Sequence, residues 1–322
     1  MRGGHDPVLD PGLPRRGVAI ACMFGAGLLF AVMSLCAKAA GTPLAGKPIP
    51  AAESTFFRFA FGTVVMLPFL RVRNARLLGE DKLGLTMRGL TGGAAVLCYF
   101  VALEQTTLTH AVLLNFTSIV FAPICAFVAL RERIGPPTVI AIVLASVGIV
   151  LVTRPVGGGA NLGDLAGLAS GMLAGAAVTS IRHLRRGETA SSIFFYFSLV
   201  GMPIAAVACL FEPLVWPTAA GWALLLGMAA SSVIAQMLQT FGYGFVRTSE
   251  GVLMTLSQIV YSSLASSLLF REPLPMATIV GGGLILAAGI WSASTPKTPQ
   301  GMARAVSNPS AGSGGPDRWS TR

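Results

Sequence analysis

The chain contains THAVLLNFTSIVFAPICAFVALRE at residues 109–132 and, 140 positions later, SEGVLMTLSQIVYSSLASSLLFRE at residues 249–272. Both stretches are apolar spans that end in Arg-Glu, and Val112 of the first copy matches Val252 of the second. A hydrophobic span that returns at a fixed shift indicates a chain built from two similar halves. The matched Arg-Glu ends are candidate gate or packing elements of the two halves.

The composition is that of a membrane protein. Of the 322 residues, 53% are hydrophobic and 11% are charged, and the mean hydropathy is +0.72. A soluble chain of this size could not bury that much apolar surface in one core. The net charge of +10 does not indicate nucleic-acid binding, because the basic residues lie between apolar runs. The five cysteines lack metal-ligand spacing, so we expect no metal, no cofactor and no disulfide framework.

Apolar runs of membrane-spanning length recur along the whole chain. They lie near 17–38, 50–70, 85–104, 109–130, 136–153, 163–181, 191–211, 221–244, 250–270 and 274–293. About ten spans would place an odd number of crossings between the two copies, so the second copy would be inverted. The predicted fold class is therefore an all-α integral membrane protein with about ten transmembrane helices in two inverted five-helix repeats. The repeats would cover residues 1–160 and 161–293, and residues 294–322 would form a disordered cytoplasmic tail.

The distribution of basic residues predicts the orientation. If the N-terminus is inside, most Lys and Arg fall in segments assigned to the cytoplasm, including Arg71, Arg73, Arg76, Lys82 and Arg88 from the end of the second span to the start of the third. The external loops then hold only Lys47, Arg154 and Arg271. We therefore expect both termini in the cytoplasm and the chain in lipid, in a bacterial inner (plasma) membrane.

These features resemble the drug/metabolite transporter superfamily, specifically its ten-span EamA-type members. The resemblance rests on the fourth span with Pro123 and Glu132, on its echo ending in Glu272, and on Arg58 in the second span. It implies a transporter with a substrate site between the repeats and with the fifth and tenth spans at the periphery. Because Ser263 stands where the first copy has Pro123, a proline break is expected in the fourth span only.

Polar residues inside the spans are the candidate substrate-binding residues. An arginine as deep as Arg58, roughly 12 Å along its helix, is costly unless it faces protein, water or an anion. A carboxylate or phosphate site and a structural arginine both fit this position. Helical spacing predicts one polar stripe from Ser232 to Tyr243 and another from Thr255 to Ser266, facing each other across a wet cavity. The candidate set comprises Arg58, Asn115, Ser118, Gln236, Gln239, Tyr243, Thr255, Gln258, Tyr261 and Ser262.

Four titratable residues at the span ends are candidates for gating or coupling. They are Lys38, Glu53, Glu104 and His110. A Lys38–Glu53 ion pair is the favoured structural interpretation of the first two. His110 could sense protons, although a solvated loop histidine is the simpler interpretation.

Glycines mark two further surfaces. Gly163, Gly167, Gly171 and Gly175 recur every four residues in the sixth span, which predicts a close intramolecular helix contact. The glycine-rich tenth span is the candidate interface of a homodimer.

We therefore predict a secondary transporter, not an enzyme, that moves a small anionic or zwitterionic metabolite such as an amino acid by alternating access. The alternatives are an exporter of drugs, or a carrier of a nucleoside-type metabolite such as S-adenosylmethionine. A membrane-embedded enzyme or a structural membrane protein is a further alternative, but catalytic motifs of the common kinds are absent from the sequence.

Overall fold

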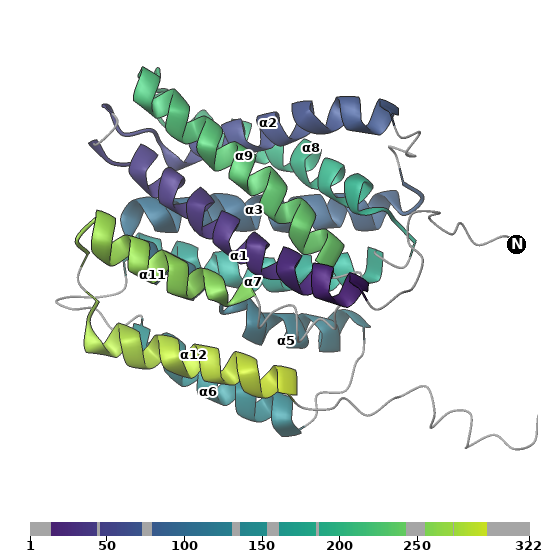
Figure 1. Cartoon of the computed structure of the whole chain (residues 1–322), viewed down its shortest axis with the longest axis vertical. Coiled ribbons are helices and arrows are strands. Elements are labelled where there is room, and N and C mark those ends of the chain that lie inside the picture. The colour runs from purple at the N-terminus through teal and green to yellow at the C-terminus, as the bar shows by residue number, and fades with distance from the viewer. Residues whose placement is uncertain are drawn as a thin grey trace, which may run out of the picture.

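The computed structural model of the chain describes residues 14–43, 46–72, 79–130, 136–152, 161–184, 187–242, 255–272 and 274–294. Within these ranges all regular secondary structure is helical (Figure 1). The helices are α1 (Pro14–Ala40), α2 (Ala51–Val72), α3 (Lys82–Gln105), α4 (Leu108–Asn115), α5 (Ser118–Leu130), α6 (Pro136–Val152), α7 (Leu162–Leu184), α8 (Ala190–Cys209), α9 (Ala219–Gly242), α11 (Ser257–Leu269) and α12 (Met276–Ser294). Residues 131–135, 243–254 and the tail from 295 lie outside the described residues, and so do the predictions for Glu132, Tyr243 and a disordered tail.

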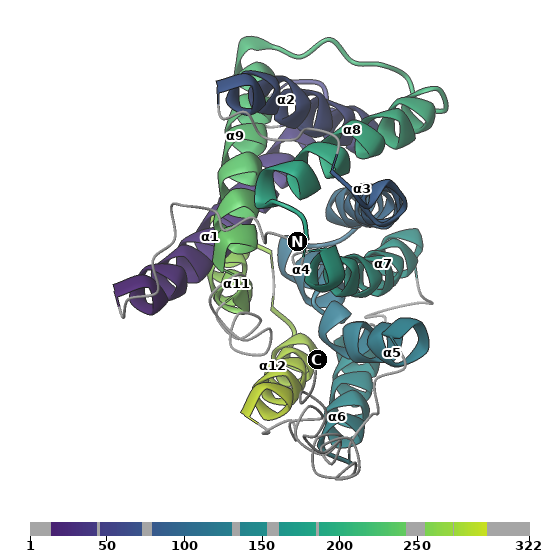
Figure 2. The same cartoon turned by 90° about the vertical axis from the view of Figure 1, so that its right-hand side faces the viewer.

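Helices of the two halves correspond under the same shift of 140 positions. The shift relates α1 to α7, α2 to α8, α3 to α9, α5 to α11 and α6 to α12. The packing follows this relation, because α1 packs on α9 as α7 packs on α3, and α1 packs on α11 as α7 packs on α5. The pairs α2/α8 and α6/α12 each join a helix to its own counterpart. This pseudo-twofold arrangement confirms the predicted two inverted repeats (Figure 2).

The helices α6 and α12 form a separate pair at one side of the bundle. In Figures 1 and 2 they lie together, away from α2, α3 and α9. Their most extensive contact is with each other. The expectation that the fifth and tenth spans are peripheral is confirmed.

The outer surface of the helices is apolar. By length and composition, five of the described helices can cross a membrane: α1, α3, α7, α8 and α9. Large apolar side chains such as Val143, Leu264 and Leu268 are more than half exposed. Large exposed apolar side chains on helices long enough to cross a membrane belong against lipid, so the chain is an integral membrane protein.

The fourth span is interrupted near its middle. The helix α4 ends at Asn115 and α5 begins at Ser118. At the break the N–H and the hydroxyl of Thr117 both donate to the carbonyl of Leu114, at 3.1 and 2.6 Å. Bonds between residues three apart tighten the chain into a turn and release carbonyls from the regular helix.

The ninth span has a matching break without a proline. Leu256, the counterpart of Phe116, precedes α11, and its carbonyl accepts a bond from the N–H of Ile259 at 2.9 Å. The expectation of a break caused by Pro123, and of none in the second copy, is wrong. Pro123 lies inside α5, and the breaks instead occupy equivalent positions in both repeats.

The glycine stripe of α7 supports the broken fourth span. A Cβ atom at Gly171 would overlap the hydroxyl of Thr117, and one at Gly175 would lie 2.8 Å from the backbone nitrogen of Ala122. Only glycine lets the two backbones approach this closely. The predicted intramolecular role of the stripe is confirmed.

Candidate functional site

Arg58 is buried in the interior of the bundle. It lies about 10 Å from the start of α2, and only 4% of it is exposed. Its Nε donates a hydrogen bond to the hydroxyl of Ser232 on α9 at 2.5 Å. Its guanidinium carbon lies 5.3 Å from the ring centre of Phe59 and 5.5 Å from that of Phe197. Among the described residues Nη1 has no hydrogen-bond partner, and the ion pairs found there do not include Arg58.

A second buried arginine lies beside the same aromatic ring. Sequence places Arg88 with the charges between two spans, but the structure places it inside α3 with 4% exposure. Its guanidinium carbon lies 4.4 Å from the ring centre of Phe197, and its Nε and Nη1 have no partner in the described part of the chain. Gly92 makes this placement possible, because a Cβ there would overlap Nη1 of Arg88. The guanidinium therefore extends along α3 towards the middle of the span.

A chain of polar contacts joins three helices close to Arg58. The hydroxyls of Ser34 on α1 and Tyr99 on α3 lie 2.7 Å apart. Gln258 of α11 donates from Nε2 to the same Ser34 oxygen at 3.4 Å. The predicted residue Gln258 thus contacts Ser34, which in turn contacts Tyr99, and the sequence singles out neither of these two hydroxyls.

The two polar stripes contact α1 and α2. Ser232 of the first stripe reaches Arg58 on α2, and Gln258 of the second reaches Ser34 on α1. This differs from the expectation that the stripes face each other, since α9 and α11 both pack on α1. Gln236 donates to Gln239 at 3.5 Å, one turn along α9.

The other candidate residues have varied environments. Asn115, at the end of α4, donates to the hydroxyl of Ser170 on α7 at 3.1 Å, so it serves the packing of the broken span. Thr255 and Ser262 are buried, and the Ser262 hydroxyl has no partner among described residues. Ser118 and Tyr261 are half-buried.

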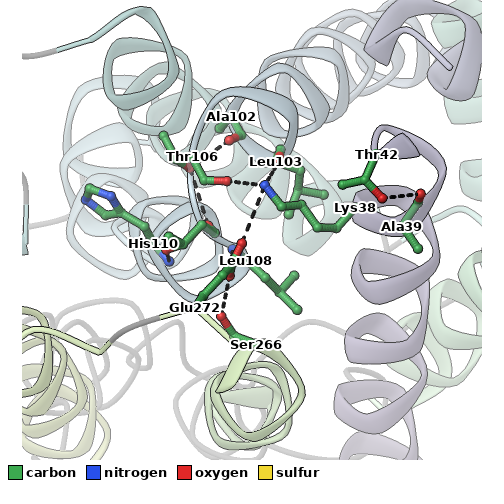
Figure 3. Close-up of polar contacts among 11 residues, drawn as sticks. Lys38, Ala39, Thr42, Ala102, Leu103, Thr106, Leu108, His110, Ser266 and Glu272 are labelled. Atoms are coloured by element: carbon green, nitrogen blue, oxygen red, sulfur yellow. Dashed lines mark hydrogen bonds and ion pairs between the residues drawn. The ribbon is translucent and has the colours of Figure 1, made fainter. Parts of the chain in front are cut away.

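Lys38 and Glu272 form a polar cluster at the end of the bundle where α1, α3 and α11 finish (Figure 3). The Lys38 ammonium lies 3.6 Å from Oε1 of Glu272 and donates to the carbonyls of Leu103 and Thr106 at 2.9 and 2.5 Å. Oε2 of Glu272 accepts from the N–H of Leu108 at 2.9 Å. The cluster, which we call the Lys38 end, therefore joins the first repeat to the second.

The hydroxyl of Ser266 completes this cluster, because it donates to the same Glu272 oxygen. Glu272 follows Arg271, whose φ of 51° lies in the left-handed region. That uncommon conformation ends α11 and turns the chain so that the carboxylate of Glu272 folds back onto Ser266. The Arg-Glu end of the second repeat therefore has a defined structural part in the contact.

The favoured Lys38–Glu53 pair is wrong. Oε2 of Glu53 instead accepts from the N–H of Val215 at 3.0 Å, and Oε2 of Glu104 accepts from the N–H of Ala51 at 3.2 Å. These acids therefore tie helix ends to neighbouring segments.

His110 is not a solvated loop residue. It lies in α4, its side chain is 20% exposed, and its Nδ1 is 3.6 Å from Oδ1 of Asp164 on α7. The contact joins the first repeat to the second at the same end as Lys38. Within the described residues no group of three His, Cys, Asp or Glu side chains could hold a metal ion.

Comparison with known proteins identifies two matching segments. The sequence pattern of the EamA-like transporter family matches residues 17–154 and again residues 161–294. The pseudopaline exporter CntI of Pseudomonas aeruginosa is 28% identical over 292 residues, which cover 90% of this chain and 99% of the exporter. The riboflavin transporter of Brucella anthropi is 26% identical over 228 residues, covering 69% of this chain and 79% of that protein.

A solved crystal structure has the same fold. It superposes with a TM-score of 0.61 at 21% identity and covers 90% of this chain and 99% of the solved chain. At this identity the likeness concerns the arrangement of the helices alone.

Proposed function

The chain belongs to the EamA-like transporter family, and from this premise we propose that it is a secondary transporter of a small metabolite that carries an anionic group, such as an amino acid. The family and its named relatives are transporters of small molecules, so the chain is a membrane transporter and not an enzyme. The finer statement about the substrate rests on Arg58.

The observation that carries the proposal is that Arg58 is buried and forms no ion pair with any residue that the structure describes. A buried guanidinium in an apolar span is costly unless an anion or a set of acceptors satisfies it. In the described part of the chain the guanidinium has a neutral partner, Ser232, and its Nη1 has no hydrogen-bond partner. Its planar fork suits a carboxylate, so an anionic substrate would supply the missing partner.

Alternating access fits the two-repeat architecture. The contacts of Arg58 with Ser232 and of Ser34 with Gln258 each join a helix of the first repeat to a helix of the second, so movement of one repeat against the other would change them. The Lys38 end would be one gate. We place this end outside the cell and both termini in the cytoplasm of a bacterial inner membrane, with the halves divided near residue 160. Pairing of two copies through α12 remains a prediction.

Export is the direction that we favour. Its support is the pseudopaline exporter, which this chain matches over nearly the whole length of that protein. Accumulation of substrate by inside-out vesicles, but not by right-side-out vesicles, is the expected result.

The proposal is tested by ligand-induced stabilisation of the purified full chain. A panel of amino acids and other carboxylated metabolites, with their uncharged amides as counterparts, should contain compounds that raise the melting temperature, because a ligand of the folded state stabilises it. Arg58→Gln should weaken binding of these compounds about tenfold or more, since it removes charge-assisted hydrogen bonds.

Lys47→Gln is the matched control, because Lys47 is exposed near the start of α2. It removes one positive charge without touching the buried site. If carboxylates raise the melting temperature of Arg58→Gln as much as that of the unmodified protein, Arg58 has a structural role and does not bind substrate.

A further inference from the structure

We infer that the transported molecule carries two carboxylates and that Arg88 binds the second one, an inference that rests on the proposed function of Arg58. Arg88 comes from α3 and Arg58 from α2, so the two cations enter the interior from different helices. Both guanidiniums lie against the ring of Phe197 in α8. The two positive charges are therefore neighbours beside one aromatic side chain.

Among the residues that the structure describes, no acidic side chain forms an ion pair with either arginine. Each is 96% buried, and each has at least one unpaired guanidinium nitrogen among the described residues. The ion pairs found there, Lys38–Glu272 and His110–Asp164, lie at one end of the bundle and involve neither arginine. Two like charges in a low-dielectric interior also repel each other. Two negative charges are needed to make this site favourable.

The free nitrogens show how two carboxylates would be held. Among the described residues Nε and Nη1 of Arg88 have no hydrogen-bond partner, and because their N–H groups point away from different edges of the guanidinium, each can donate to an anionic oxygen. Arg58 has its Nε engaged by Ser232 and offers Nη1. The ring of Phe197 has cation–π contact with both guanidiniums. It stabilises the cations without supplying an acceptor, and so leaves the nitrogens available.

Gly92 keeps Arg88 in this position. Besides overlapping Arg88, a Cβ at residue 92 would lie 2.8 Å from the Phe197 ring. The absence of a side chain thus creates the space in which the guanidinium extends towards the middle of the membrane. An arginine in a cytoplasmic loop, with its side chain in solvent, would need no such space.

The test compares pairs of compounds that differ by one negative charge. Glutamate and glutamine, aspartate and asparagine, and glutarate and its monoamide are added to the purified full chain, and binding is measured from melting-temperature shifts. In the unmodified protein the diacid of at least one pair should bind about tenfold more tightly than its amide. Arg88→Gln should abolish that difference, Arg88→Lys should restore part of it, and Arg58→Gln should weaken binding of both members.

Lys82→Gln is the control on the same helix, because Lys82 is exposed at the start of α3. Equal binding of diacid and amide in every pair, with both weakened by Arg58→Gln, would overturn the role of Arg88 and leave the proposed function standing. If inorganic phosphate raises the melting temperature as much as glutarate does, both arginines bind one anionic group. That result would also overturn the role of Arg88 in binding a second carboxylate. Absence of binding by every compound, with Arg58→Gln indistinguishable from the unmodified protein, would overturn both proposals.

Discussion

At the scale of single residues, the lack of a side chain at Gly92 leaves room for the guanidinium of Arg88, which lies one turn earlier in α3. Gly92→Ala changes no charge, yet its Cβ would overlap the guanidinium of Arg88 and press on Phe197. Because Arg88 must leave its place, we expect diacid binding to weaken to the level of Arg88→Gln. The crowding itself should destabilise the fold by about 1–3 kcal/mol. Both effects are measured by thermal unfolding with and without glutarate.

Gly283→Ala serves as the control for this residue, because a Cβ at Gly283 of α12 meets no atom within 4 Å. It should leave stability and binding almost unchanged. Diacid binding by Gly92→Ala equal to that of the unmodified protein would contradict the account of Gly92.

At the scale of helices, the broken fourth span depends on the surface of α7. At Gly171 a Cβ would overlap the Thr117 hydroxyl and lie 2.6 Å from the carbonyl of Leu114, which accepts both bonds at the break. Gly171→Ala should therefore push α7 away from the break and lower the free energy of unfolding by about 1–3 kcal/mol. The measurement is thermal or denaturant unfolding of the purified protein.

The comparison variant is Gly227→Ala on α9, where the new Cβ would meet only Cys36 Sγ at 3.5 Å, an ordinary contact. A stability loss in Gly227→Ala as large as that in Gly171→Ala would show that the break places no special demand on position 171.

At the scale of the whole molecule, the Lys38 end joins the two repeats through a partly buried ion pair between Lys38 and Glu272, beside the His110–Asp164 contact. Glu272→Gln preserves an oxygen that can accept from Leu108 and Ser266, but it removes the charge that attracts Lys38. A loss of about 1.4 kcal/mol would raise the population open at this end about tenfold. Hydrogen exchange of residues 106–112 should accelerate accordingly.

Glu53→Gln is the appropriate comparison for this variant. Its side chain also accepts a backbone N–H at the same end, from Val215, but forms no ion pair within the described part of the chain. Exchange that accelerates equally in both variants would show that the ion pair does not control opening.

Sequence predicted the architecture better than the site. Long apolar runs and the 140-residue repeat fix the number and inversion of the halves, because lipid requires helices of spanning length. Arg58 was found because a charge inside an apolar run is conspicuous. Arg88 lies only three residues inside its apolar run and closely follows Lys82, so its position in the sequence groups it with the cytoplasmic charges. Burial of that arginine depends on the glycine one turn later, which hydropathy does not register.

Tertiary contacts were predicted least well. Ser34 and Tyr99 are single hydroxyls in apolar runs, and only the packing of α1 on α11 brings Ser34 to Gln258. Likewise, Lys38 is near Glu53 in the sequence, but its partner Glu272 arrives from the far repeat. The proline also indicates the wrong position for the helix break, because Pro123 lies inside α5 and the break comes before that helix begins at Ser118. For both Ser34 and Lys38, the contact partner lies far away in the sequence, in the second repeat.

Helices of the first repeat pack mainly on helices of the second, and this affects how the protein folds during its insertion into the membrane. Within the first repeat α1 has few contacts with α2 and α3, whereas it packs extensively on α9 of the second. When the ribosome has finished the first five spans, most of their packing surfaces still face lipid, and their native partners have yet to be synthesised. The first repeat alone could complete its helix packing only against a second five-helix unit inserted into the membrane in the opposite orientation.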